Sequence, residues 1–353
     1  MLRGDQGRLF ALHYKRGMPE HLAIVNAGGW GTALSVLLAN AGHQVRLWCR
    51  RPALAEEIAQ CRENLVYLPG VTLPLGVQPT SSMPAAIVGA AAVILVPISR
   101  ATRDTARLVK PHLAPDTPIL HASKGLEFPS LNRLSEVVAD ELGIAAGRVA
   151  ALSGPTHAEE VGRGMPSAAV VACADASVAG LFQELLHGPT FRVYTSSDAV
   201  GVELCGALKN VIALATGASD GLGYGDNTRA ALITRSLVEI GRLVQAAGGD
   251  TRTVAGLAGL GDVVATCTSR HSRNRWAGEQ IGLGRAPDEV VSSTPKVIEG
   301  IPATRAAVEL GARFGVDLPV CLQVDQVLNH GAEVRGIMSR LMGREATVEL
   351  PSA

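Results

Sequence analysis

The sequence predicts a doubly wound α/β domain followed by an all-α domain. Short apolar runs alternate with helical patterns through the first half, which is typical of a mainly parallel sheet with helices on both faces. A glycine-rich turn follows the first apolar run, and helical patterns dominate after residue 200. A chain of 353 residues is long enough for two such domains.

Composition narrows the class of partner. The 32 basic and 32 acidic residues balance, so the chain has neither the basic field expected for nucleic acid nor a polybasic membrane patch. Every long apolar run has a polar break, so we expect no membrane span and a small-molecule ligand. The six cysteines form no CxxC pair or His/Cys cluster, which argues against a metal site and a disulfide framework and favours a reducing cytoplasm.

The first predicted strand, His21–Val25, leads through a glycine-rich turn into the predicted helix Thr32–Ala41. A dinucleotide fingerprint has glycines at three spaced positions, and Gly28 and Gly31 occupy the second and third. Asn26 stands at the first position; Asn tolerates a positive φ better than most residues, so the turn remains feasible. The loop fits a Rossmann-type cofactor site, and a plain βα turn is the alternative.

The second predicted strand, Gln44–Trp48, ends just before Arg50 and Arg51. In an NAD-dependent protein a ribose-binding acid would stand at about this place. Two guanidinium groups suit a 2′-phosphate instead, which favours NADP(H) and leaves use of NAD(H) open. A solvated basic loop is the alternative interpretation.

The rest of the predicted sheet brings three motifs to the ends of strands, where ligands bind in this architecture. VPIS (96–99) closes one of these strands. SKGLE (123–127) places Lys124 at one such end, although an ordinary loop lysine would look the same. In SGPTHAEE (153–160), Thr156 and Glu159 have capping-box spacing, and the N–H groups at this helix start would attract an anion. We interpret His157 as a packing residue rather than a base. The strands are predicted at Ala91–Val96, Pro118–His121, Val149–Leu152 and Ala168–Ala172, with helices such as Thr102–Val109 and Leu131–Leu142 between them.

The stretch Val202–Ala215 reads as a helix buried on all sides, yet Lys209 and Asn210 lie in its middle. Burying an ammonium without a partner costs several kcal/mol, so Lys209 requires a facing carboxylate or an adjoining cleft. A side chain that reaches solvent along its own stem is the alternative. Asp262 is the candidate partner, because it stands at the end of the stretch GLAGLGD (256–262), which we expect to be a flexible glycine loop.

A second polar motif, SRNR (272–275), stands at a predicted helix start. Arg273 and Asn274 beside Ser272 combine a fork-shaped cation, an amide donor and a positive helix end, which is a natural phosphate clamp. A capped, solvated loop is the alternative. The other helices of this half are predicted at Thr228–Ala246, Trp276–Ile281, Ala303–Phe314 and Leu318–His330.

Seven motifs, in order and without large gaps, carry a family resemblance over residues 21–345. They are NLVYLPG (64–70), SKGLE, SGPT, GVELCGALKN (201–210), DGLGYGDNTRAALITR (220–235), GLAGLGD and SRNR. Together they closely resemble the NAD(P)-dependent glycerol-3-phosphate dehydrogenases of bacterial type. With the change of pattern near residue 200, the predicted domains are a disordered extension (1–20), a dinucleotide-binding domain (21–200), a helical substrate and dimerisation domain (201–345) and a tail (346–353).

The resemblance implies an oxidoreductase that reduces dihydroxyacetone phosphate reversibly to sn-glycerol 3-phosphate and supplies glycerophospholipid synthesis. It also implies a homodimer, with NADP(H) preferred on the evidence of the two arginines. Lys209 corresponds to the proton-transferring lysine and Lys124 to a second active-site lysine. The implied residues are, as catalytic groups, Lys209, Lys124 and Asp262; as further substrate contacts, Gly154, Thr156, Ser272, Arg273 and Asn274; and as cofactor contacts, Gly28, Gly29, Trp30, Gly31, Arg50, Arg51, Lys124, Ala158, Arg273, Val297 and Glu299.

Four residues depart from the family pattern. Asn26 replaces a fingerprint glycine, and Gly29 replaces a serine that contacts the pyrophosphate. His157 stands for a phenylalanine, and Cys205 for a glycine beside the catalytic lysine. The first two bear on cofactor affinity more than on reaction type.

Two other functions remain open from the sequence. One is a two-domain dehydrogenase acting on a hydroxy acid or an acyl thioester, which the SRNR clamp disfavours. The other is a cofactor-binding regulator without turnover, which the retained Lys209, Lys124 and Asp262 disfavour.

Overall fold

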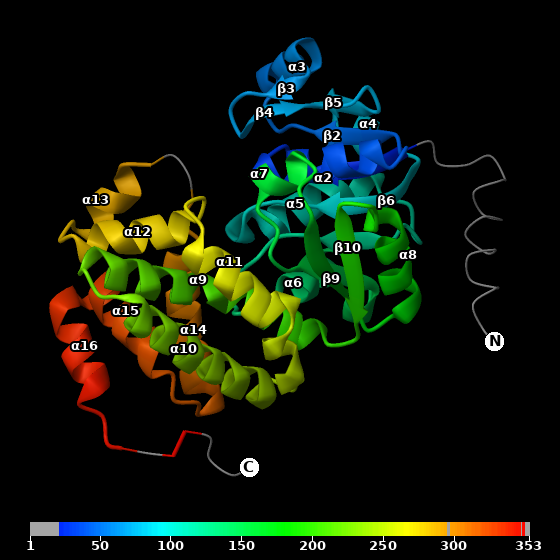
Figure 1. Cartoon of the computed structure of the whole chain (residues 1–353). Helices are drawn as coiled ribbons and strands as arrows, with labels where there is room; N and C mark the ends of the chain where they lie inside the picture. Colours follow the sequence, from blue (N-terminus) through cyan, green and yellow to red (C-terminus); the bar gives the residue numbers. More distant parts are fainter. Residues whose placement is uncertain (1–20, 295–296, 347, 350–353) are drawn as a thin grey trace. The chain divides into compact units, whose positions relative to one another are not determined.

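The computed structural model describes residues 21–294, 297–346 and 348–349. The chain divides into two compact units, the first ending at Glu203 and the second beginning at Leu204. The first unit is built on a sheet with helices, and the second is helical (Figure 1). The predicted extension of residues 1–20 lies outside the described residues, as do residues 347 and 350–353 of the predicted tail.

The first unit holds an eight-stranded sheet in the order β10-β9-β8-β7-β6-β1-β2-β5. All neighbouring strands are parallel except β8 and β9. The chain therefore winds outward in both directions from β1 and β6, which confirms the doubly wound prediction. The strands are β1 (His21–Val25), β2 (Val45–Trp48), β5 (Val77–Thr80), β6 (Ala90–Leu95), β7 (Ile119–His121), β8 (Val149–Ser153), β9 (Ser167–Ala172) and β10 (Phe191–Ser196).

Strand β1 shows why the central strands read as continuous apolar runs. Leu22 and Ile24 enter one hydrophobic core, while Ala23 and Val25 enter the core on the opposite face. A strand covered on both faces has no solvent side on which polar residues would alternate. Helices α2 (Gly29–Asn40), α3 (Pro52–Cys61) and α8 (Ala176–Leu186) pack into the first core, and α4 (Met83–Ile87), α5 (Thr102–Val109) and α6 (Leu134–Leu142) into the second.

A small antiparallel hairpin stands apart from the main sheet. Strands β3 (Glu63–Asn64) and β4 (Leu68–Thr72) form it, directly after α3. Leu68 and Val71 belong to the core beneath the hairpin, which the short helix α7 (Ala158–Gly162) also joins through Val161. This hairpin matches the NLVYLPG motif.

In the second unit, the residues that the structure describes form helices and no strand, as predicted. The central helix α9 extends well beyond the predicted apolar stretch. Backbones of α9 and α12 touch, because a Cβ on Gly217 would lie 2.0 Å from Arg275 O and one on Gly278 2.1 Å from Leu214 O. The helices are α9 (Ala199–Gly221), α10 (Asp226–Ala246), α11 (Asp262–Thr268), α12 (Arg273–Gly282), α13 (Pro287–Ser292), α14 (Gly300–Phe314), α15 (Pro319–His330) and α16 (Val334–Met342).

Among the helices that the structure describes, α9 alone is long and apolar enough to cross a bilayer, with a mean hydropathy of 1.4. Of that apolar window, 83% is buried inside the protein. A core helix shows this degree of burial, so the length and composition of α9 are weak evidence for a membrane span.

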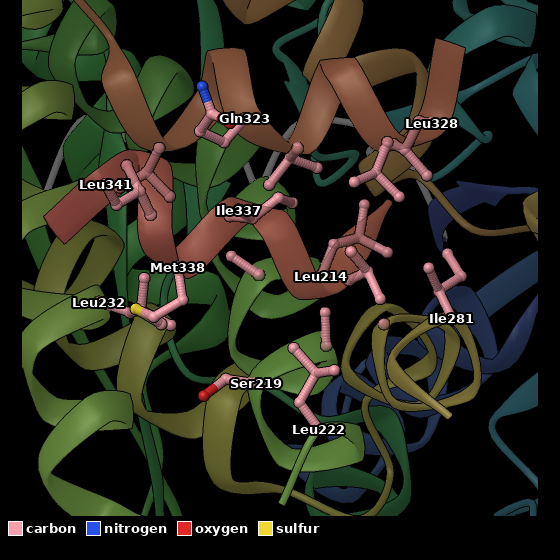
Figure 2. A pocket seen from close by; sticks show the side chains of 17 residues that line it. Leu214, Ser219, Leu222, Leu232, Ile281, Gln323, Leu328, Ile337, Met338 and Leu341 are labelled. Atoms are coloured by element: carbon pink, nitrogen blue, oxygen red, sulfur yellow. The ribbon is translucent and has the colours of Figure 1, made fainter. Parts of the chain in front are cut away.

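An apolar pocket lies within the second unit, next to α16 (Figure 2). Leucine, isoleucine, valine, methionine and alanine side chains of α9, α10, α12, α15 and α16 line most of it, and its empty space is about 580 Å³, including the part open to solvent. Ser219 and Gln323 are its polar lining residues, and none of the predicted site residues lines it. An apolar lining of this kind does not suit a sugar phosphate.

Candidate active site

The sheet gathers four loops at one edge. The segments that follow β1, β6, β7 and β8 all leave the carboxyl ends of adjacent parallel strands. The winding direction reverses between β1 and β6, and ligands of doubly wound sheets bind in the crevice at such a point. The glycine-rich turn, VPIS, SKGLE and SGPTHAEE are these four loops, so the predicted placement of the motifs is confirmed.

The turn after β1 has the geometry of a dinucleotide loop. Asn26 adopts a φ of 89°, so it takes the left-handed conformation for which a glycine is usual. A Cβ on Gly31 would lie 2.0 Å from Asn26 O, so only glycine lets α2 pack this closely on the strand. Gly28 is the N-cap of α2, and nothing lies within 4 Å of where its Cβ would be.

These features fit a bound pyrophosphate. The first turn of α2 carries no acidic side chain, and its N-cap residue has no side chain to close the helix end. The N–H groups of such a helix start attract anions. Trp30 follows Gly29 in this first turn and is partly buried against the core.

The two arginines predicted to read the cofactor lie beside this turn. Strand β2 pairs with β1 in a register that sets Trp48 opposite Val25, and Asn26 N donates to Trp48 O at 3.2 Å. Arg50 and Arg51 follow after Cys49, and both are exposed.

Lys124 links two of the loops. Its Nζ donates to Gly154 O at 2.9 Å, and Thr156 Oγ1 donates to the same oxygen at 3.1 Å. The structure thus brings together three of the predicted substrate residues. The predicted capping box is wrong: α7 begins at Ala158 with His157 as its N-cap, and the Thr156 hydroxyl is turned back to Gly154. Ala158 itself stands next to the glycine-rich turn, since its Cβ would lie 3.7 Å from a Cβ on Gly29.

In the second unit, Lys209 is buried and makes two polar side-chain contacts. Its Nζ donates to Asp262 Oδ1 at 2.6 Å and to Thr266 Oγ1 at 2.8 Å. The three residues are 6%, 2% and 3% exposed. The predicted pairing with Asp262 is therefore present, and the lysine does not reach solvent along its stem. The carboxylate compensates part of the hydration that a buried ammonium loses.

The segment before Asp262 is ordered differently from expectation. Leu257–Gly261 forms a single π-helical turn that runs into α11, in place of a flexible glycine loop. A Cβ on Gly259 would lie 2.1 Å from Val254 O, so this close approach requires glycine. Single π-turns are frequent at functional sites. Here the turn leads directly into α11 and sets Asp262 at its first position.

The SRNR motif lies against the residue next to Lys209. Asn274 Nδ2 donates to Asn210 Oδ1 at 2.8 Å, and Asn274 Oδ1 accepts from Gly300 N at 2.9 Å. Ser272 is the N-cap of α12 and accepts from Arg275 N at 3.2 Å. Arg273 is the exposed first residue of the helix.

Two predicted cofactor residues are near this group. Glu299 precedes Gly300 as the N-cap of α14, and Val297 lies two residues earlier and is half-buried. The second unit thus assembles Lys209, Asp262, Ser272, Asn274 and Glu299 by contact or adjacency.

Sequence reasoning missed two buried polar residues, Thr266 in the second unit and Glu203 at the end of the first. Thr266 is one helical turn beyond Asp262, so the i, i+4 spacing on α11 could have revealed it. Glu203 lies 3.0 Å from His121 Nε2 and accepts from Arg133 Nη1 at 2.8 Å and Ser135 N at 2.9 Å. Burial alone would raise the pKa of Glu203, but His121, Arg133 and Ser135 lower it to about 2. A glutamate within an apolar run was the available signal.

Among the residues that the structure describes, no group of three or more His, Cys, Asp and Glu side chains is arranged to hold a metal ion.

Comparison with known proteins decides the family. Residues 21–179 match the model for the NAD-dependent glycerol-3-phosphate dehydrogenase N-terminus, and residues 198–339 match that for the C-terminus. The chain belongs to this family. It is accordingly an NAD(P)-dependent oxidoreductase with a Rossmann-type first unit.

Relatives cover nearly the whole chain. The glycerol-3-phosphate dehydrogenase [NAD(P)+] of Moorella thermoacetica is 50% identical over 95% of this chain and 99% of its own. The Prosthecochloris aestuarii protein of the same name is 45% identical over 93% of this chain and 99% of its own. The crystal structure of glycerol-3-phosphate dehydrogenase from Coxiella burnetii is 39% identical, with a TM-score of 0.87, over 92% of this chain and 99% of that one.

Proposed function

We propose that this chain catalyses the reversible NAD(P)H-dependent reduction of dihydroxyacetone phosphate to sn-glycerol 3-phosphate, and so supplies glycerophospholipid synthesis. The observation that carries the proposal is the buried Lys209, held by Asp262 and Thr266 in a segment that matches the family. A buried lysine with this support is suited to proton transfer, whereas a purely structural position would be filled at less cost by an apolar side chain.

The cofactor, when bound, supplies a hydride to the C2 carbonyl of the substrate. The Lys209 ammonium polarises that carbonyl and gives a proton to its oxygen, and Asp262 holds the ammonium in place. Lys124 acts as the second active-site lysine. Arg273 and Asn274 bind the substrate phosphate, and Ser272 caps the N-terminus of the helix that carries them.

Asn274 is prepared for this role by its own contacts. Its amide nitrogen donates a hydrogen bond to Asn210, and its amide oxygen accepts one from Gly300 N. The side chain is therefore fixed before any ligand binds. A fixed donor binds an oxyanion without losing rotamer entropy. Gly154 and Thr156 complete the proposed substrate contacts.

On the cofactor side we assign the pyrophosphate to Gly28, Gly29, Trp30 and Gly31 and the 2′-phosphate to Arg50 and Arg51, with NADP(H) preferred over NAD(H). The register of β1 and β2 supports this, since it sets the arginines beside the turn. Lys124, Ala158, Arg273, Val297 and Glu299 are the remaining proposed cofactor contacts.

We further propose a cytoplasmic homodimer. All six cysteines are free thiols, five of them buried, which suits a reducing compartment. The dimer is inferred from the family resemblance and from the apolar helical unit, and sedimentation or light scattering tests it.

The deciding experiment is steady-state oxidation of NADPH and NADH by the purified protein with dihydroxyacetone phosphate, a 2-keto acid and an acyl thioester as alternative substrates. We expect turnover with dihydroxyacetone phosphate, absent without it. Turnover with a keto acid alone would identify a different dehydrogenase. Cofactor binding without turnover on any of the three would identify a regulator.

A further inference from the structure

A buried amide spans the two ends of the glycine-rich turn. Asn64 is 0% exposed, and its Nδ2 donates to Ala27 O at 3.0 Å and to Thr32 Oγ1 at 2.8 Å. Ala27 precedes Gly28 and Thr32 follows Gly31, so the one side chain bridges the turn from start to end. Removing this amide would leave buried polar groups of the turn without hydrogen-bond partners, which is unfavourable.

The same amide also fixes the tip of the β3–β4 hairpin. Asn64 Oδ1 accepts from Tyr67 N at 3.1 Å. Leu65, Val66 and Tyr67 are 50%, 49% and 46% exposed, so apolar burial contributes little to holding this tip. The position of the tip therefore depends on Asn64 and on the buried Leu68 that follows it.

The hairpin tip meets the turn at Gly29. A Cβ on Gly29 would lie 2.8 Å from Tyr67 O, a distance that real Cβ atoms essentially never show. Residue 29 has room only because it is glycine. The carbonyl of Tyr67 fills that space, and the N–H of the same residue donates to Asn64.

We propose that Asn64 is a positioning residue for the dinucleotide. Its hydrogen bonds to Ala27 and Thr32 fix the conformation of the Gly28–Gly31 turn, and its contact with Tyr67 fixes the hairpin tip beside Gly29. The N–H groups at the start of α2 are therefore preorganised to bind the pyrophosphate. The inference rests on the proposed function, which assigns this turn to the cofactor. Asn64 itself touches neither cofactor nor substrate in this account.

The first test uses Asn64→Ala and Asn64→Asp, which retains an acceptor for Tyr67 N but loses both donors to the turn. We expect the Kd and KM for NADPH to rise about 10-fold in both variants, with kcat at saturating NADPH and the KM for dihydroxyacetone phosphate within about 2-fold. Leu75→Ala, at a side chain 88% exposed beyond the hairpin, is the matched control and leaves all four constants unchanged. Unchanged NADPH affinity in Asn64→Ala, or a fall confined to kcat, overturns the proposal.

The second test is a double-mutant cycle with Gly29→Ala, which remains informative if the Asn64 variants lose stability. On its own, Gly29→Ala forces its Cβ against Tyr67 O and weakens NADPH binding. In the Asn64→Ala background the tip is free to retreat, so the same substitution has a smaller effect and the cycle shows non-additivity. Additive effects on the NADPH Kd contradict a tip held by Asn64.

The two proposals fail in different ways. A wild-type protein that binds no NADPH and does not oxidise it with dihydroxyacetone phosphate refutes the proposed function, and this inference with it. A wild-type protein that does both, with variants that bind NADPH normally, refutes the role of Asn64 alone.

Discussion

The Nζ of Lys209 lies 2.6 Å from Asp262 Oδ1, and the two side chains are 8% and 2% exposed. They belong to different helices, α9 and α11, and stand 53 positions apart in the chain. A buried ion pair adds little net stability compared with an apolar pair of similar volume, but removing one partner leaves the other charge uncompensated. The pair therefore makes both residues sensitive to substitution, for stability and for chemistry alike.

Asp262→Asn should lower both stability and turnover. The variant leaves the Lys209 ammonium buried without a counter-charge, so we expect a loss of about 3 kcal/mol in the free energy of unfolding. The kcat should fall by ~10²-fold or more, with NADPH affinity less affected. Urea unfolding and steady-state kinetics measure the two effects.

The matched control is Asp317→Asn. Asp317 lies 2.6 Å from Arg344, but both side chains are about half exposed. Because solvent screens such a pair, this variant should stay within about 0.5 kcal/mol of wild type. If Asp262→Asn were as stable and as active as Asp317→Asn, the importance of the buried pair would be refuted.

Thr266 should matter for turnover through Lys209. Its Oγ1 accepts from Lys209 Nζ at 2.8 Å, and its hydroxyl lies 3.4 Å from Asp262 Oδ1. Thr266→Val removes a hydrogen bond to a charged group, so we expect kcat to fall about 10-fold, while Thr266→Ser restores most of it. Equal kinetics for the Val and Ser variants would show that the hydroxyl has no part in holding the lysine.

Elements were predicted correctly from the sequence where their hydrophobic pattern matches the burial of their residues in the fold. Strand β1 was predicted because each of its residues is apolar and each enters one of two cores. Strand β10 was missed, although Phe191 and Val193 are buried and alternate with the exposed Arg192 and Tyr194. Its polar half resembles a capping segment, and only the pairing with β9 settles the strand.

The site was predictable where a residue type had an unusual setting. A lysine in an apolar helix requires a partner, so Asp262 followed from Lys209. The role of Asn64 does not follow in this way, because its contacts with Ala27 and Thr32 span 37 and 32 positions and no local pattern reports them. Tertiary contacts of this kind appear only once the chain is folded.

Glu239 should give the second unit a pH-dependent stability. Its carboxyl is 2% exposed and accepts from the backbone N–H groups of Val320 at 2.8 Å and Cys321 at 3.3 Å, at the start of α15. Burial raises the pKa of Glu239 to about 7, although these two hydrogen bonds and Arg242 oppose the shift. The folded chain therefore holds a proton that the unfolded chain releases above its ordinary pKa of 4.5.

The direction in which stability changes with pH follows from the number of protons that the folded and unfolded states bind. Between pH 4.5 and about 7 the folded state binds more protons at Glu239 than the unfolded state, so stability falls as the pH rises through this window, by roughly 3 kcal/mol. Glu203 behaves in the opposite sense: its lowered pKa of about 2 gives stability that is present above pH 4.5 and lost on acidification towards 2.

The test for Glu239 is urea unfolding at pH 5 and pH 8. The free energy of unfolding should differ less between the two pH values in Glu239→Gln than in wild type. An identical pH dependence in the two proteins would exclude Glu239 as its source.

Arg50 and Arg51 should determine the choice between the two nicotinamide cofactors. They follow β2 beside the glycine-rich turn, and both are exposed, so they are accessible to a 2′-phosphate. Each charge-assisted hydrogen bond to a phosphate contributes about 1.5–3 kcal/mol, so Arg50→Ser and Arg51→Ser should each raise the Kd for NADPH about 10-fold or more. NADH lacks the 2′-phosphate, and its Kd should change by less than about 2-fold. The wild-type Kd for NADPH should also rise more steeply with salt than that for NADH, because salt screens exposed charges.

Arg192→Ser is the matched control, since Arg192 is an exposed arginine of β10, at the opposite end of the strand order, where it stacks on Tyr194. Equal losses for both cofactors, or the same NADPH loss in the Arg192 variant, would show that the two arginines do not read the 2′-phosphate.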